Sequence, residues 1–208
     1  MTTRPLRQLD DETELAAARR AFIDAALEIV SRKATLDVAV VDVVRRSGWH
    51  NAAFYRIFGS KDALLLAVAE EAVRRAAEVL AERVEDAHGS AAQVRAWTTV
   101  LLHRASTSTA AAATQPFALD RHRLLYRFPD AEEQLTLPIR AVLHDVLRAA
   151  ARPDAIAAGD AATELVLSQQ ATWLATRHRP AEAEIEQFSG LILRLVGLAG
   201  DEGTEEDT

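Results

Sequence analysis

Cysteine is absent from this sequence, which also has one methionine and few aromatic residues. Without cysteine the chain can form no disulfide bond and perform no thiol catalysis, and its composition fits a reducing compartment. Aromatic residues make up 5% of the 208 residues, while alanine is abundant. We therefore expect a core of closely approaching helices with few large side chains, since no alternating β-branched run favours strands.

Long apolar runs are also missing. The segment LILRLVGLAG near the C-terminus is interrupted by Arg194, and no other run approaches the length that spans a bilayer. The first residues, MTTRPLRQLDDETEL, lack the apolar core of a signal peptide. These absences predict a cytoplasmic protein without a membrane partner. The hydrophobic fraction of 49% is ample for one large domain or two small ones.

The net charge of −7 is unevenly distributed. Residues 15–61 contain eight Lys and Arg against four Asp and Glu, a net charge of +4 that leaves −11 for the remainder. A basic N-terminal module on an acidic body concentrates the attractive field for DNA at one end of the molecule.

Residues 40–65, VVDVVRRSGWHNAAFYRIFGSKDALL, contain two short helical patterns around a glycine. Val40, Val43 and Val44 are spaced to share one side of a first helix. Gly48 follows where the chain must turn sharply, because glycine reaches the left-handed backbone conformation without penalty. The pattern predicts a helix followed by a tight turn.

A second short helix is expected from Asn51, whose side chain is a suitable N-cap, with Phe54 and Phe58 on its buried side. Its outward residues are small, hydrogen-bonding or cationic, as suits a helix in the major groove of DNA. Ser60 is then placed to cap a third helix, whose N-terminal end attracts a phosphate. Together these elements predict a DNA-binding helix-turn-helix.

At this point the chain resembles the TetR family of transcriptional regulators. The pattern Tyr-x-x-Phe-x-Ser-Lys-x-x-Leu runs from Tyr55 to Leu64, directly after the turn at Gly48, within the first third of the chain. The resemblance implies that Tyr55 and Lys61 contact DNA phosphates and that residues 50–53 occupy the recognition positions. Trp49 and His50 replace the family's usual Val and Ser, so no operator sequence can be transferred from a relative.

Nine residues form the predicted DNA-binding set. Arg45 and Arg46 belong to it as candidate phosphate contacts, with an ordinary solvated pair as the alternative. Aromatic residues at helical spacing usually bury, so Trp49 and the two phenylalanines are assigned to the core instead. The full set is Arg45, Arg46, His50, Asn51, Ala52, Ala53, Tyr55, Arg56 and Lys61.

The predicted fold is all-α, with an N-terminal three-helix helix-turn-helix domain and a larger C-terminal helical domain for effector binding and dimerisation. Helical spacing predicts further helices near residues 12–32, 61–87, 91–107, 137–152, 158–178 and 181–199. Pro116, Pro129 and Pro138 are expected to interrupt the stretch that follows the third of these helices. The expected segments are a disordered arm (1–11), the DNA-binding domain (12–61), the C-terminal domain (62–200) and an acidic disordered tail (201–208). In the arm, Arg4 and Arg7 are weaker candidates for minor-groove contact.

An effector cavity is expected in the C-terminal domain, where the prolines loosen the helices. The candidate lining residues are aromatic or polar, and each has core packing as its alternative. Since no fixed charge dominates the set, the expected effector is mostly apolar with one or two hydrogen-bonding groups. The set is Trp97, His103, Phe117, His122, Tyr126, Gln169 and Trp173.

The final helix combines an apolar stripe with small residues every seven positions. A glycine inside a helix costs roughly 1 kcal/mol relative to alanine, so another helix is expected to approach closely. Spacing leaves open whether that helix belongs to the same subunit, but the resemblance implies pairing of the last two helices with a second subunit. The predicted homodimer interface contains Ala183, Ile185, Phe188, Gly190, Ile192, Leu195 and Gly197.

The resemblance favours a repressor whose homodimer binds a pseudo-palindromic double-stranded operator and is released by a small effector. One alternative is a dimeric DNA-binding protein that responds to no effector. The other is an all-α enzyme, which the scattered histidines and the lack of a metal-ligand pattern, phosphate loop or nucleophile elbow disfavour. We expect no metal and no cofactor.

Overall fold

The computed structural model describes residues 12–199, except for the side chains of residues 113, 121, 122 and 132. Across this range the elements are all helical, which confirms the predicted all-α class. In chain order they are α1 (Glu12–Lys33), α2 (Val40–Ser47), α3 (Asn51–Phe58), α4 (Lys61–Glu85), α5 (Ser90–His103), α6 (Ser108–Arg127), the 3₁₀ turn η1 (Pro129–Ala131), α7 (Glu132–Ala149), α8 (Ala155–Thr176) and α9 (Glu182–Leu195).

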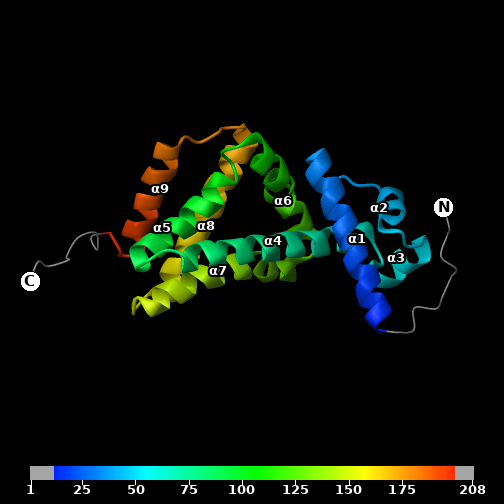
Figure 1. Cartoon of the computed structure of the whole chain (residues 1–208), viewed down its shortest axis with the longest axis horizontal. Coiled ribbons are helices and arrows are strands. Elements are labelled where there is room, and N and C mark those ends of the chain that lie inside the picture. The colour runs from blue at the N-terminus through cyan, green and yellow to red at the C-terminus, as the bar shows by residue number, and fades with distance from the viewer. Residues whose placement is uncertain (1–11, 200–208) are drawn as a thin grey trace, which may run out of the picture.

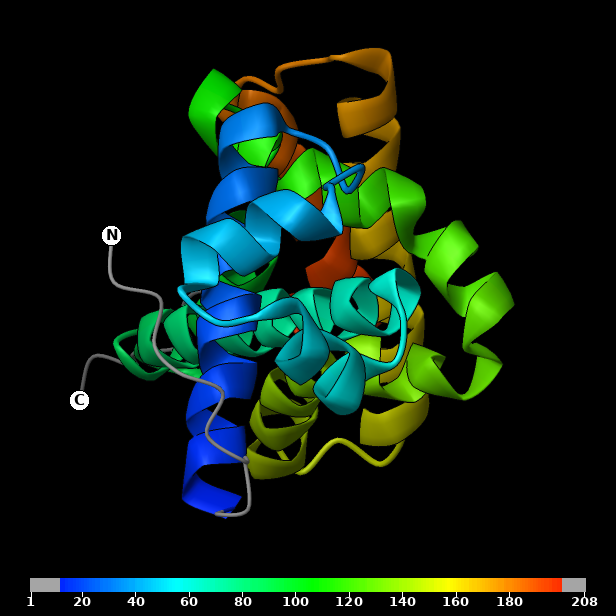
Figure 2. The same ribbon diagram turned by 90° about the vertical axis from the view of Figure 1, so that its right-hand side faces the viewer.

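Helices α1, α2 and α3 form one end of the elongated molecule, and α4 runs from them into the body (Figure 1). Their core is aromatic: the rings of Phe54 and Phe58 meet Phe22 edge-on, at centroid distances of 5.6 and 6.0 Å. Leu64 and Leu65 from the start of α4 complete this N-terminal core. In the end view of Figure 2, α2 crosses in front of α1, and α1 packs against both α2 and α3, so α1 supports the helix-turn-helix from the inside.

The body packs α5, α7, α8 and α9 around the second half of α4. Trp97 on α5 is fully buried there, and its indole N–H donates a 3.1 Å hydrogen bond to the carbonyl of Ile139 on α7. Helix α6 spans the gap between body and N-terminal end, because it packs against both α8 and α1. Among the described residues no helix is long and apolar enough to cross a membrane.

Two of the three predicted interruptions at proline are wrong. Pro116 lies inside α6 and Pro138 lies inside α7, whereas Pro129 does begin the short turn between these helices. A proline removes one backbone hydrogen bond from a helix, but packing on both sides can hold the helix together across that defect. Residues 108–127, expected to be irregular, therefore form a 20-residue helix.

The final helix is shorter than predicted. It ends at Leu195, and Gly197 follows it with a left-handed φ of 71°. Gly197 therefore ends the helix instead of lining its interior, since glycine is preferred where φ is positive just beyond a C-terminus. The predicted arm, with Arg4 and Arg7, and the predicted acidic tail lie outside the described residues.

Candidate functional site

The turn between α2 and α3 is built as the sequence predicts. Gly48 has a φ of 74°, which is the left-handed conformation that ends α2. The N-cap of α3, however, is His50 and not Asn51: the Nδ1 atom of His50 accepts a 3.0 Å hydrogen bond from the backbone N–H of Ala53. An imidazole nitrogen can satisfy a free helix N–H as an Asn or Ser side chain does. This bond fixes the orientation of the His50 ring at the start of α3.

The outward face of α3 consists of Asn51, Ala52, Tyr55 and Arg56, all exposed to solvent. Tyr55 is 53% exposed while its ring edge contacts Phe54 at a centroid distance of 5.1 Å, which holds the phenol in place. Ala53 is corrected, because it is 1% exposed and its methyl group belongs to the N-terminal core. Its side chain cannot reach a base.

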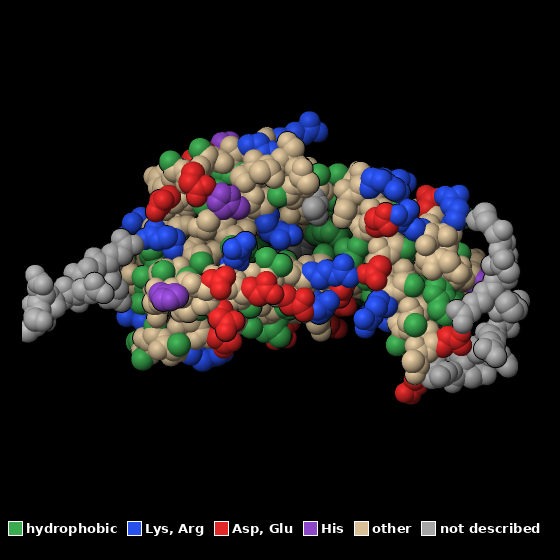
Figure 3. All heavy atoms as spheres, in the orientation of Figure 1, with side chains coloured by type: hydrophobic (Ala, Val, Ile, Leu, Met, Phe, Trp, Pro, Cys, Tyr) green, Lys and Arg blue, Asp and Glu red, His purple; other side chains and the backbone are tan. Residues whose placement is uncertain are grey.

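Lys and Arg side chains gather where the end of α1 meets α2 (Figure 3). Arg45 bonds to Asp42 on its own helix, and Arg46 bonds to Glu28 of α1 through its Nε at 2.6 Å. Lys33 lies 3.6 Å from the second oxygen of Asp42. These exposed ion pairs are weak in water, so a DNA phosphate could compete for either arginine.

Lys61 opens α4 beside the α3 face. Its Nζ donates a 2.8 Å hydrogen bond to Asp37, in the loop before α2. This hydrogen bond and the positive charge of Lys61 hold the pKa of the Asp37 carboxyl below its usual value. Ser60 caps α4 by accepting a 3.1 Å hydrogen bond from the N–H of Ala63, as predicted from the sequence. In the free protein the predicted phosphate-binding lysine is thus held by an acid.

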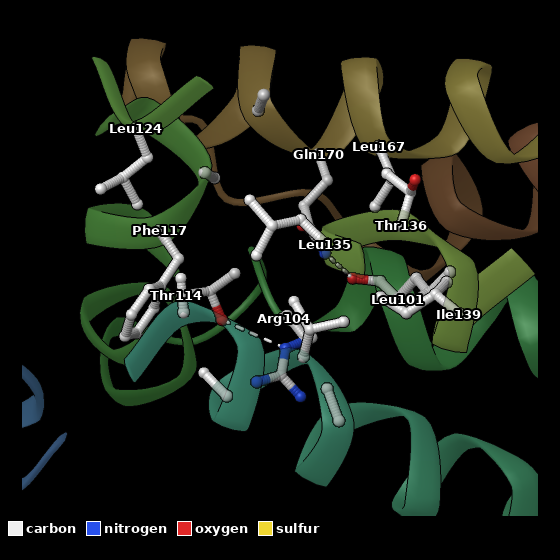
Figure 4. Close-up of a pocket in the computed structure, with 16 residues that line it drawn as sticks. Leu101, Arg104, Thr114, Phe117, Leu124, Leu135, Thr136, Ile139, Leu167 and Gln170 are labelled. Atoms are coloured by element: carbon white, nitrogen blue, oxygen red, sulfur yellow. Dashed lines mark hydrogen bonds between the residues drawn. The ribbon is translucent and has the colours of Figure 1, made fainter. Parts of the chain in front are cut away.

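A second candidate site is a cavity of about 160 Å³ that is partly open to solvent and lined by α4, the end of α5, α6, α7 and α8 (Figure 4). Its wall is mostly apolar, with small residues on α4 and larger side chains such as Leu135 and Ile139 on α7. Gln170 on α8 donates a hydrogen bond to the carbonyl of Leu101 in the last turn of α5. Within the described residues, no group of three or more side chains is arranged to hold a metal ion.

One cation lines this cavity. Arg104 immediately follows α5, and its Nε donates a 3.2 Å hydrogen bond to the hydroxyl of Thr114 on α6. The hydrogen bond appears as a dashed line in Figure 4. Burial lowers the pKa of the Arg104 guanidinium, which nevertheless stays charged because a free guanidinium loses its proton only above about pH 12.

Of the seven predicted cavity residues, Phe117 lines the cavity. Trp97 and Trp173 belong to the body core, and Tyr126 is 88% exposed, so these three assignments are corrected. His103 faces outward with its Nε2 3.2 Å from Glu182, and Gln169 lies beside the lining residue Gln170 without lining the cavity itself. The side chain of His122 lies outside the described residues.

Most residues of the cavity wall are absent from the predicted set, which contained aromatic and polar residues alone. Ala69, Ala72 and Ala76 recur on one face of α4 at helical spacing, which indicates a close neighbour but not an empty space. Arg104 was not predicted either, since long charged side chains mostly lie in solvent. Its position one residue after an apolar helix end was the available indication.

The predicted interface residues of α9 divide between two faces. Ile185 and Ile192 are 1% and 0% exposed within the single chain, so a partner cannot reach them, and their assignment is corrected. Phe188 also packs on the body core, with its ring centroid 6.4 Å from that of Trp173. The exposed faces of α8 and α9 instead contain Leu165, Leu191 and Leu195 together with Ala183.

Comparison with known proteins matches the N-terminal end to a family. The family model of bacterial regulatory proteins of the tetR family matches residues 22–68, from α1 to the start of α4. The HTH-type transcriptional regulator BetI of Brucella suis biovar 1 (strain 1330) is 28% identical over 141 residues, which are 59% of this chain and 70% of BetI.

Solved structures share the whole fold. A transcriptional regulator from Rhodococcus sp. RHA1 has a TM-score of 0.63 at 17% identity, covering 86% of this chain and 94% of that one. RolR, solved with its ligand resorcinol, has a TM-score of 0.62 at 16% identity, covering 92% and 97%. The exposed helix-turn-helix on a helical body therefore defines a DNA-binding transcriptional regulator. Residues 22–68 match the TetR family of such regulators, and the chain as a whole is similar in fold to solved transcriptional regulators.

Proposed function

We propose that this regulator is a repressor whose homodimer binds a pseudo-palindromic operator and is released by a small, mostly apolar effector. The observation that supports this proposal most directly is that one helix, α4, contributes residues both to the DNA-binding end and to the wall of the cavity. Lys61 begins this helix beside the recognition face, and Ala69, Ala72 and Ala76 of the same helix line the cavity. A ligand in the cavity thus contacts the helix from which the DNA-binding end projects.

A second connection supports the same mechanism. Leu124 on α6 and Leu135 on α7 line the cavity and also pack in the N-terminal core. At the end of α6, Arg123 and Arg127 lie 3.7 and 3.4 Å from the carboxylate oxygens of Asp62, in the first turn of α4. A ligand that repositions α6 would therefore also move the contacts by which α6 holds the N-terminal core and the first turn of α4.

The proposed switch requires unequal binding. A ligand with the same affinity for the DNA-binding and released arrangements would shift nothing, so the effector must prefer the released arrangement. RolR, which has the same fold, holds the small phenol resorcinol. That complex supports a small organic molecule as the effector of this chain.

For the contacts to DNA we propose that Tyr55, Arg56 and Lys61, with Arg45 and Arg46, contact phosphates, while His50, Asn51 and Ala52 face the bases. Two such surfaces in a twofold dimer would meet successive major grooves about 34–36 Å apart. We propose that the exposed faces of α8 and α9 form the dimer interface. Their exposed leucines, among small residues, suit close packing against a second copy.

Selection of bound fragments from genomic DNA by the purified protein tests this proposal, since it yields the operator directly. Lys61→Ala is expected to weaken binding to all fragments and to lower the slope of log affinity against log salt by about one. Asn51→Ala should instead change which fragments are selected. Arg83→Ala, an exposed change far along α4, is the control. Unchanged binding by Lys61→Ala would contradict the proposed docking.

A further inference from the structure

Arg104 places a positive charge in the wall of an otherwise mostly apolar cavity. It lies at the C-terminal end of α5, where its Nε donates a hydrogen bond to the Thr114 hydroxyl. That single bond leaves the terminal nitrogens of the guanidinium, which carry four of its five N–H donors. The other polar lining residues, Thr136 and Gln170, are uncharged.

No carboxylate among the described side chains forms an ion pair with Arg104. Burial is the one cause that shifts its pKa, and that shift is downward, whereas a nearby acid would raise it. A partly desolvated cation without an opposite charge is unfavourable, and among the described side chains the hydroxyl of Thr114, which is uncharged, is the partner that Arg104 has. The missing partner is an anion that enters the cavity.

The cavity limits the rest of the ligand. Its volume of about 160 Å³ is close to that of an engineered apolar cavity of about 150 Å³ that admits benzene. Side chains such as Phe117, Leu135 and Ile139 would contact an apolar body of that size. A planar guanidinium fork matches a carboxylate in shape and charge, while a phosphate monoester would bring nearly two charges to one arginine.

We propose that the effector is a small organic carboxylate, with an aryl or short alkyl body in the apolar part of the cavity and its carboxylate paired with Arg104. This inference rests on the proposed effector function and adds the charge and size of the ligand. It adds a negative charge to the mostly apolar effector with one or two hydrogen-bonding groups that the sequence favoured, since Arg104 was not among the predicted lining residues.

Calorimetric titration of the full chain with sodium benzoate and with benzamide tests the inference, because the two differ mainly in charge. The wild type should bind benzoate at least about tenfold more tightly, as expected for one charge-assisted pair. Arg104→Gln should bind both compounds equally while its affinity for benzamide stays unchanged, which also shows that the variant is folded. Arg104→Lys should retain part of the preference, and Arg83→Gln all of it.

Equal affinities of the wild type for benzoate and benzamide would overturn the inference, as would a preference that survives in Arg104→Gln. Absence of benzoate binding up to about 10 mM, or tighter binding of phenyl phosphate, would overturn it too. Mobility shifts with selected DNA fragments separate the two proposals. If benzamide releases DNA as readily as benzoate does, the proposed carboxylate is wrong but the proposed effector function stands. If the protein binds no DNA at all, the proposed function is wrong, and this result does not bear on the ligand of the cavity.

Discussion

Lys61 has two competing partners in the proposed function. In the free protein its amine bonds to Asp37, whose side chain is largely exposed. A DNA phosphate would have to replace that carboxylate, which would then lie close to the negatively charged backbone of the DNA. Asp37 is therefore expected to limit non-specific affinity for DNA.

Asp37→Asn tests this competition. Removing the carboxylate charge frees Lys61 and removes a repulsion, so affinity for any duplex should rise several-fold at low salt and less at high salt. Mobility shifts or fluorescence anisotropy over a salt series would measure the effect. In the double variant with Lys61→Ala most of the gain should disappear. A gain of the same size in that background would show that Asp37 acts independently of Lys61.

Residue roles were predictable where a single local pattern determines them. Gly48 and Ser60 take the predicted turn and cap, because both roles depend on backbone geometry within a few positions. The cap at His50 and the burial of Ala53 were missed, since they depend on where α3 begins and on the rotation it adopts against α1. Arg104 was missed because its role depends on neighbours distant in the sequence.

Among the elements, the helices with continuous apolar spacing were predictable and the two proline-containing helices were not. Pro116 is buried within α6, so packing with other helices offsets the lost hydrogen bond. That compensation comes from residues far along the chain and leaves no local pattern. The N-terminal core also reaches Ala69, past the predicted domain boundary at residue 61, so we propose that the first turns of α4 belong to the DNA-binding domain.

The packing of α7 against α8 depends on Gly159. A Cβ atom at this position would lie 2.8 Å from Nε2 of the buried His144 ring. Gly159→Ala should therefore lower the free energy of unfolding by about 1–3 kcal/mol, measured by urea denaturation. In a His144→Ala background the same substitution should be neutral or stabilising by up to about 1 kcal/mol, because only helix propensity remains. An equal loss in both backgrounds would place the strain elsewhere.

Helix α4 is joined to α1 by a network of charges. Arg75 contacts both Glu71 and, at 2.6 Å, Asp24 of α1. The hydrogen bond from Arg74, followed by that from Arg75, lowers the pKa of the Glu71 carboxyl from 4.5 to about 2. A lowered carboxyl pKa stabilises the fold above the unfolded value of 4.5, and the contribution disappears as the pH falls toward 2.

Glu71→Gln should thus be less stable than the wild type at pH 7, by about 1 kcal/mol or less because solvent screens the network. The difference should shrink as the pH falls from 4.5 to about 2, which urea midpoints across this range would show. Glu85→Gln, at the exposed end of α4 and outside this network, is the control. A difference that is constant with pH would mean that the carboxylate charge contributes nothing.

For the molecule as a whole, the proposed dimer determines how two recognition helices are presented. The Leu191 and Leu195 side chains are 41% and 43% exposed in the single chain, and a second copy would bury them. Leu191→Glu and Leu195→Glu should convert a dimer to a monomer, because a charge would be buried unpaired at the interface. Light scattering would show the halved mass, and binding to a two-half-site operator should weaken in parallel.

Val79→Glu is the matched control, since Val79 is 50% exposed on α4 and outside the proposed interface. A wild-type protein that remains monomeric at micromolar concentration would contradict the proposed dimer. The fold itself would be unaffected by that result, because α9 packs on α5 within one chain.

Leu124 and Leu135 stand in the wall of the cavity and in the N-terminal core at once. Any substitution there that enlarges the cavity for a bulkier ligand also removes packing from the DNA-binding end. A change of inducer and a loss of operator affinity would then arise from one mutation. Adapting this protein as a biosensor should therefore begin on the α8 side of the cavity, at Leu167 or Ala171, where the two properties can change separately.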